Sequence, residues 1–113
     1  MTHPVQVRPS GPRDRAALRH LHQAAFGSDV EADLVDALLA DPQAAPLESL
    51  VAEVDGEVSA HCLLTCVRID GTAGTLARIL APLAVLPEHQ SRGFGTAVTV
   101  AALDAARAVG VVL

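Results

Sequence analysis

The sequence predicts an α+β fold, a mixed and mainly antiparallel sheet flanked by helices. One strand-like run is followed by two helical stretches, three further strand-like runs and a third helical stretch. The turn signals Asp55-Gly56 and Asp70-Gly71 separate the three later runs, which is typical of antiparallel hairpins. With 113 residues, half of them hydrophobic, the chain suits one core and is too short for two. We expect residues 1–113 to belong to a single domain.

A short strand over Val5–Arg8 opens the chain, and a helix over Pro12–Phe26 follows it. Gly11 suits the position that precedes the helix, and a carboxylate at Asp14 meets the positive end of the helix dipole. Gly27 should end the helix, because glycine readily takes the left-handed conformation found there.

A second helix is expected over Val30–Ala40. Its apolar residues recur at helical spacing, and Ser28 with Glu31 has the spacing of a capping box. Asp41-Pro42 should end it, because the residue before a proline avoids helical dihedrals.

Two strands, Leu50–Val54 and Glu57–Val67, are expected on either side of the Asp55-Gly56 turn. The second alternates, so its residues should fall on two faces. One face should carry Val58, Ala60, Cys62, Leu64 and Cys66, and the other Ser59, His61 and Thr65.

A nearly all-apolar strand is expected over Leu76–Leu86. Pro82 removes one ladder donor, so the strand should lie at an edge or be bulged there. A helix is then expected from about Gly93 to Val109, with Gly110 after its end. Val111 would begin a further strand.

Composition excludes several classes of protein. The net charge is −5, the aromatic rings are only Phe26 and Phe94, and no basic stripe is present, which argues against a nucleic-acid partner. No apolar run reaches the roughly 18 residues of a membrane span, and the N-terminus lacks a signal-peptide pattern. We therefore expect a cytoplasmic protein with no membrane partner.

Two cysteines, Cys62 and Cys66, fall in one predicted strand. Four residues of strand span about 13 Å, which is beyond the reach of a disulfide. For the same reason the pair should not bind a metal. We expect two buried free thiols, consistent with a reducing compartment.

A glycine-containing loop over Gln90–Gly95 joins the apolar strand to the last helix. The first turn of a helix has unpaired N–H groups and a positive dipole end, and glycines allow close approach of a ligand. This combination favours a pyrophosphate, and Arg92 could add a charged contact. The residues fit neither a Walker loop, which needs Gly-Lys-Ser/Thr, nor a dinucleotide fingerprint.

This segment resembles the acetyl-coenzyme A signature of the GNAT N-acetyltransferases. The motif Gln-x-x-Gly-x-Gly follows a strand that ends Leu-Ala-Val-Leu-Pro-Glu-His, and the order of elements upstream also fits. Residues 58–64 and 80–85 are similar to the YhbS-like bacterial branch, and the resemblance covers essentially the whole chain. It implies a GNAT-like (acyl-CoA N-acyltransferase) fold, acetyl-CoA as co-substrate and no metal. The activity implied is acetyl transfer to a primary amine.

The resemblance also implies roles for particular residues. A strand segment would pair with the pantetheine arm, and the loop would hold the pyrophosphate through backbone N–H groups. A backbone N–H near Val85 or Leu86 would stabilise the oxyanion. The implied cofactor-binding residues are Leu83, Ala84, Val85, Ser91, Arg92, Gly93, Phe94, Gly95 and Thr96.

Complete family members continue with a further helix and strands, and often supply a tyrosine as general acid. Tyrosine is absent here, so we expect a C-terminally truncated domain that is inactive alone. His61, on the more polar face of a central strand, is the first candidate for the catalytic base. His89 and Glu53 are alternatives. His20 and His22, on the first helix, are expected at the surface.

Other readings stay open. A non-catalytic acyl-CoA-binding module, or a degenerate fragment, would explain the missing acid, and a purely structural domain would bind no acetyl-CoA. The acceptor could be a small molecule or a peptide amine, and a homodimer is left open.

Overall fold

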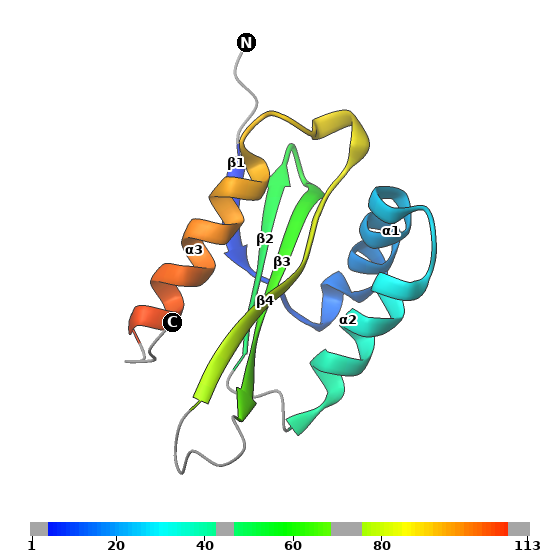
Figure 1. The fold of residues 1–113 in the computed structure, drawn as a ribbon. Coiled ribbons are helices and arrows are strands. Elements are labelled where there is room, and N and C mark those ends of the chain that lie inside the picture. Colours follow the sequence, from blue (N-terminus) through cyan, green and yellow to red (C-terminus); the bar gives the residue numbers. More distant parts are fainter. Residues whose placement is uncertain (1–4, 43–46, 69–75, 109–113) are drawn as a thin grey trace.

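The structure, a computed structural model, describes residues 5–42, 47–68 and 76–108. Its four strands form one sheet in the order β1-β2-β3-β4, and every neighbouring pair is antiparallel. Helix α3 covers one face, and α1 and α2 lie on the other (Figure 1). The elements in chain order are β1 (Val5–Pro9), η1 (Pro12–Asp14), α1 (Arg15–Phe26), α2 (Val30–Ala40), β2 (Glu48–Val54), β3 (Glu57–Arg68), β4 (Leu76–Val85), η3 (Pro87–His89) and α3 (Phe94–Ala108).

The first helical segment begins and ends as the sequence predicts. The backbone N–H of Gly11 donates to Asp14 Oδ2 at 2.7 Å, which fixes the start of η1. Arg8 in β1 contacts the same carboxylate at 2.9 Å and also contacts Glu53 in β2 at 2.8 Å. Gly27 follows α1 with a φ of 74°, so the left-handed end predicted there is confirmed.

Helix α2 has the predicted bounds, but the expected capping box at its start is wrong. Asp29, and not Ser28, is the N-cap residue, and no side chain caps the helix. Ser28 Oγ instead contacts the Glu31 carboxylate at 3.3 Å. The Asp33 N–H donates to the Asp29 carbonyl at 2.8 Å, so the helical hydrogen bonds begin at Asp29 and Ser28 lies one residue before the N-cap position.

The Asp55-Gly56 turn joins β2 to β3, as predicted. Both residues have positive φ, 51° and 82°, which matches the right-handed twist of the flanking strands. The β2–β3 register shifts next to the turn, between Ala52 and Glu53. Because of this bulge, the predicted face of Val58 is wrong: it packs on the α1 side, while Ala60 packs beneath α3.

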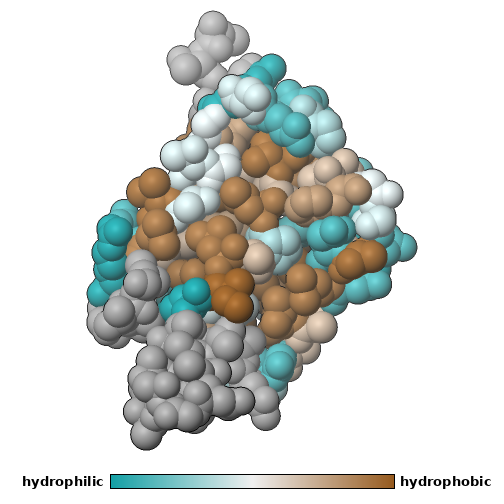
Figure 2. Space-filling model, viewed as in Figure 1, coloured by the Kyte–Doolittle hydropathy of each residue, from teal (hydrophilic) through white to brown (hydrophobic). Residues whose placement is uncertain are grey.

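Strand β4 lies at an edge of the described sheet and is also irregular at Pro82. Cys62 pairs with Leu83 and Leu64 with Leu80, so two residues of β4 oppose one of β3. The edge position and the bulge, predicted as alternatives at Pro82, are therefore both present. Ile79 and Leu83 are 49% and 40% exposed, and apolar side chains gather over this region in Figure 2.

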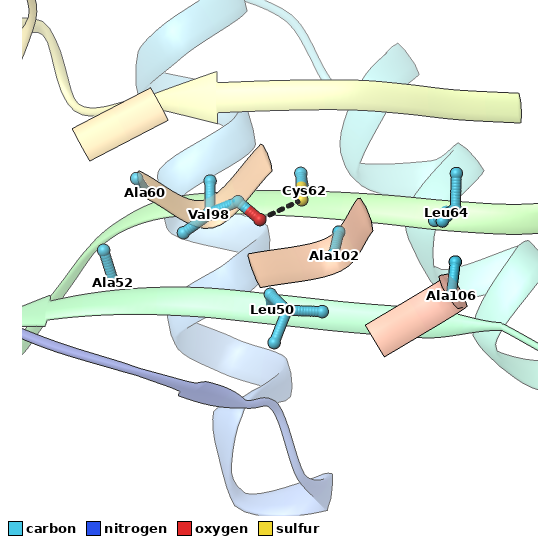
Figure 3. Close-up of a cluster of buried hydrophobic side chains, with 8 residues drawn as sticks. All are labelled: Leu50, Ala52, Ala60, Cys62, Leu64, Val98, Ala102 and Ala106. Carbon is cyan, nitrogen blue, oxygen red and sulfur yellow. Dashed lines mark hydrogen bonds between the residues drawn. The ribbon is translucent and has the colours of Figure 1, made fainter. Parts of the chain in front are cut away.

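The larger core cluster lies between the sheet and α3. Small residues of the helix fit against β2 and β3, and Cys62 Sγ lies 3.2 Å from the Val98 carbonyl oxygen (Figure 3). Both cysteines are free; Cys62 is buried and Cys66 only half-buried, so the prediction of two buried thiols holds for one of them. The cluster comprises Leu50, Ala52, Ala60, Cys62, Leu64, Val98, Ala102 and Ala106.

Some predictions fall outside the described residues. These are the Asp70-Gly71 turn, Gly110 and the strand from Val111. Helix α3 occupies Phe94–Ala108, within the predicted Gly93–Val109. Among the described helices, none has the length and apolarity to cross a membrane.

Candidate functional site

The end of β4 presents its backbone alternately to β3 and to the open edge. The Leu86 N–H donates to the Ser59 carbonyl of β3 at 2.9 Å. Because successive residues of a strand direct their peptide groups to opposite edges, the Leu83 and Val85 groups point outward, where the described sheet has no further strand. The Gln90 side chain reaches the outward Val85 carbonyl at 3.2 Å.

This alternation corrects one prediction. The family resemblance implies an oxyanion donor near Val85 or Leu86, but the Leu86 N–H is already bonded to the Ser59 carbonyl. The N–H of Val85 is the one that points toward the open edge.

The loop after β4 turns the chain directly into α3. Ser91 and Gly93 have positive φ values of 65° and 85°, and Phe94 begins the helix. A side chain built at Gly93 would meet nothing within 4 Å. The glycine is therefore required by backbone shape and leaves open space at the helix N-terminus, where free N–H groups and the dipole favour an anion.

Gly95 serves a different purpose. A Cβ at this position would lie 3.3 Å from Val85 Cγ2 and 3.9 Å from Leu83 Cδ2. Because these contacts come from β4, the missing side chain lets the first turn of α3 pack closely on the strand.

A groove of about 390 Å³ lies between the end of β4, the loop and α3. A volume of this size is usual for a small-molecule site. Its lining residues are Leu83, Val85, His89, Gln90, Ser91, Gly93, Phe94, Gly95, Thr96, Thr99 and Val100.

Most of the predicted cofactor-binding residues meet in this groove, but two do not. Ala84 is buried on the α1 side of the sheet, and Arg92 is exposed outside the lining. Thr99 and Val100 were not predicted. They lie three and four residues after Thr96, so helical spacing was the signal that could have found them.

His61, the predicted base, is fully buried under α1 and not in the groove. Its Nδ1 lies 2.9 Å from His22 Nε2, and its Nε2 lies 2.8 Å from Ser49 Oγ. Desolvation lowers the pKa of His61 to about 3, and that of His22 is lowered for the same reason. Both imidazoles are therefore neutral at pH 7.

The expectation that His22 lies at the surface is wrong, whereas His20 is exposed as predicted. Both histidines are on α1, and Leu18 and Leu21 are buried. His22 shares the face that packs on the sheet because it lies four residues after Leu18. That spacing was the signal the sequence offered.

The two alternative bases lie on different sides of the molecule. His89 lines the groove, with its ring edge against Phe94 at a centroid distance of 5.8 Å. Glu53 lines a second pocket on the α1 side, where it is paired with Arg8. No group of three or more metal-ligating side chains occurs among the residues described.

The sequence profile of the acetyltransferase (GNAT) family matches residues 15–113. The chain therefore belongs to this family, and the fold described above is the GNAT fold.

Particular relatives support the assignment. The chain is 43% identical over 83 residues to the uncharacterized N-acetyltransferase YjhQ of Escherichia coli K12, covering 73% of this chain and 46% of YjhQ. A GNAT family acetyltransferase of Brucella melitensis, solved with acetyl-CoA, has a TM-score of 0.84 and 34% identity, over 97% of this chain and 73% of that one. YhbS of E. coli, solved with CoA, has a TM-score of 0.84 and 26% identity, over 98% of this chain and 61% of YhbS.

The chain thus spans less than half of YjhQ and about three fifths of YhbS.

Proposed function

We propose that the protein carrying this chain transfers an acetyl group from acetyl-CoA to a primary amine. The observation that carries the proposal is one continuous groove that joins an open strand edge to a helix N-terminus. Leu83 and Val85 offer outward peptide groups, and Gly93 opens the start of α3 beside them. The relatives solved with acetyl-CoA and CoA add support.

Each part of the groove suits one part of acetyl-CoA. The N–H groups around Ser91–Thr96 would bind the pyrophosphate, because the helix dipole and the open backbone favour negative charge. The edge of Leu83–Val85 would bond the amide-containing pantetheine arm as a strand bonds its neighbour. The bound molecule supplies an activated acetyl thioester. The Val85 N–H would then donate to the carbonyl oxygen as it becomes negative.

Arg92 has a minor role in this proposal. Its side chain is exposed and outside the groove lining, so it would add a screened charge rather than a fixed contact. We infer a bacterial enzyme, because YjhQ, YhbS and the Brucella protein come from bacteria. Its cytoplasmic location stays a prediction from the sequence. The acceptor would be a small-molecule or peptide amine, and residues 1–113 would form one part of a single acetyltransferase domain.

Calorimetric titration of the full-length protein with acetyl-CoA tests the binding step, and an amine screen with thiol detection tests transfer. We expect one acetyl-CoA per chain, with thiol release only when an amine is present. Binding without release from any amine would favour a non-catalytic acyl-CoA-binding module. No binding would contradict the proposal.

A further inference from the structure

His89 is the one ionisable side chain among the described residues that line the groove. It ends the short turn η3, and its backbone N–H donates to the Leu86 carbonyl at 2.8 Å. Its imidazole lies nearly perpendicular to the Phe94 ring, with a centroid distance of 5.8 Å and an interplanar angle of 81°. Phe94 is the first residue of α3 and packs against the larger core cluster. The turn and the packed ring therefore hold His89 beside the helix N-terminus.

The two nitrogens of the His89 ring have different surroundings. Nδ1 is buried and has no hydrogen-bond partner among the described residues. Nε2 is not buried, and it too has no partner in the described part of the chain. Because the half-buried ring lines the groove, Nε2 is the nitrogen that a molecule in the groove can reach.

These surroundings select one form of the neutral ring, which carries a single N–H. Buried N–H groups without an acceptor are rare in proteins, because nothing compensates the loss of their bonds to water. A hydrogen on Nδ1 would be such a group, whereas a hydrogen on Nε2 can bond to water or to a ligand. We therefore expect the hydrogen on Nε2, where it makes His89 a donor toward the groove. In this form the ring has no accessible lone pair with which to take a proton from an amine.

The groove around Nε2 is rich in donors. The first hydrogen bond of α3 runs from the Ala97 N–H to the Gly93 carbonyl at 3.0 Å. The three N–H groups before it, those of residues 94–96, have no backbone partner in the described chain. No Asp or Glu side chain occurs among the described lining residues. A ligand that satisfies these donors must present several acceptor oxygens close together, as a pyrophosphate does.

We propose that the His89 Nε2–H donates a hydrogen bond to a phosphate oxygen of bound acetyl-CoA, which makes His89 a positioning residue of the pyrophosphate site. The inference rests on the proposed function. It gives His89, an alternative candidate for the catalytic base, a binding role instead. His89 differs from Arg92, whose exposed side chain lies outside the groove lining, because the His89 ring is held in place by its contact with Phe94.

Substitution of His89 separates phosphate binding from chemistry. His89→Phe keeps an aromatic ring against Phe94 and removes the donor. It should raise Kd for acetyl-CoA and for adenosine diphosphate roughly 10- to 100-fold, the effect of losing a hydrogen bond to a charged group. KM for acetyl-CoA should rise with kcat unchanged, because the lost bond is the same in the ground state and in the transition state. Loss of a catalytic base would instead lower kcat.

Two further variants and one ligand serve as controls. His89→Gln retains an amide N–H near the position of Nε2, so it should recover most of the affinity that His89→Phe loses. His20→Phe replaces an exposed histidine of α1 outside the groove and should bind both ligands as the wild type does. S-acetylpantetheine has the thioester arm without the pyrophosphate, so its kcat/KM should be equal in wild type and His89→Phe. An equal loss with S-acetylpantetheine would show that His89 does not act on the phosphates.

Nitrogen NMR of the histidine-labelled full-length protein tests the donor without a substitution. At pH 8 the free protein should show His89 with its hydrogen on Nε2, and saturation with adenosine diphosphate should shift the Nε2 resonance. A hydrogen on Nδ1 in the free protein, or an Nε2 resonance that saturation leaves unmoved, would overturn the proposal. This measurement decides even where His89→Phe does not fold.

The outcomes separate this inference from the proposed function. Unchanged acetyl-CoA affinity in folded His89→Phe would remove the role of His89 and leave the proposed function intact. Binding that depends on His89, without transfer to any amine, would support the role of His89 and contradict the proposed transfer. If the wild-type protein binds neither acetyl-CoA nor adenosine diphosphate, both proposals fail.

Discussion

At the residue scale, the two loop glycines have different physical roles, although the motif treats them alike. Gly93 is needed because its φ of 85° is unfavourable for any side chain, while the space around it is open. Gly95 is needed because of what its side chain would touch on β4. Substitutions should therefore separate backbone shape from packing.

Gly93→Val should abolish measurable acetyl-CoA binding, because a β-branched residue cannot hold the left-handed conformation that aims the helix N–H groups. Gly56→Val is the matched control, since Gly56 has a φ of 82° but lies in the β2–β3 turn, outside the groove. Both variants should lose about 1–2 kcal/mol of stability, and only Gly93→Val should lose affinity in calorimetry. Equal affinity in the two variants would contradict the site. Arg92→Ala should weaken binding less than Gly93→Val.

The buried histidines predict a loss of stability on the acid side. Their pKa values in the fold lie below the unfolded value, so their contribution is complete above about pH 6.5 and declines as pH falls toward the lowered values. Each histidine should lower the free energy of unfolding by at most about 1.4 kcal/mol per pH unit in that window. Urea unfolding between pH 8 and 4 measures this.

Two controls sharpen the pH measurement. His20→Gln removes an exposed histidine and should leave the profile unchanged. Asp14 also has a lowered pKa, because of Arg8, but its contribution is lost only at more acidic pH, below the usual range of a carboxyl group. A flat free energy of unfolding from pH 8 to 5 would show that the histidines are not buried as described.

At the scale of elements, the groove depends on how closely α3 approaches β4. The helix carries alanines where it crosses β2 and β3, and Gly95 where it meets β4. Small residues at these positions let the N-terminus of α3 sit beside the outward peptide groups of Leu83 and Val85. The close approach of α3 to β4 therefore positions both the strand edge and the helix N-terminus of the proposed acetyl-CoA site.

Gly95→Ala should displace the first turn of α3 from β4. Its Cβ would lie 3.3 Å from Val85 Cγ2, which is tighter than an ordinary contact, so either the Val85 side chain or the helix must shift. Overpacking of this kind typically costs about 1–3 kcal/mol, and acetyl-CoA affinity should fall several-fold. Denaturant unfolding and calorimetry measure both effects. A variant as stable as wild type with unchanged affinity would show that the contact is relieved without moving the helix.

At the scale of the whole molecule, apolar side chains gather over β4 on the face shown in Figure 2. Leu83 and Val100 line the groove and are 40% and 51% exposed. A bound acetyl-CoA would cover part of this surface while pairing with the strand edge. Binding should for this reason stabilise the fold as well as fill the site.

Saturation with acetyl-CoA at about 100 times Kd should add about 2.7 kcal/mol to the free energy of unfolding. Hydrogen exchange should slow at residues 83–85 and 91–97. Adenosine diphosphate is the control ligand, because it carries the pyrophosphate without the pantetheine arm. It should protect the loop and leave the strand unchanged. Protection confined to the α1 side would contradict the proposed orientation.

Local signals were enough for most of the helices and strands and for the glycine-containing loop that leads into α3. The turns and the helix end depend only on nearby backbone, so the sequence predicts them from the residues present. Examples are Gly27, Asp55-Gly56 and the strand–glycine–helix order around Gly93. The family followed from the same segment. These features depend on contacts between residues close along the chain.

Only the tertiary structure decided which side chains meet across the sheet. The bulge between Ala52 and Glu53 moves Val58 to the other face, and no local pattern announces it. His22 and His61 are 39 residues apart, yet the packing of α1 on β3 buries both and links them to Ser49. Burial then sets their pKa values. Such contacts depend on how elements pack, which residue types and spacing alone do not specify.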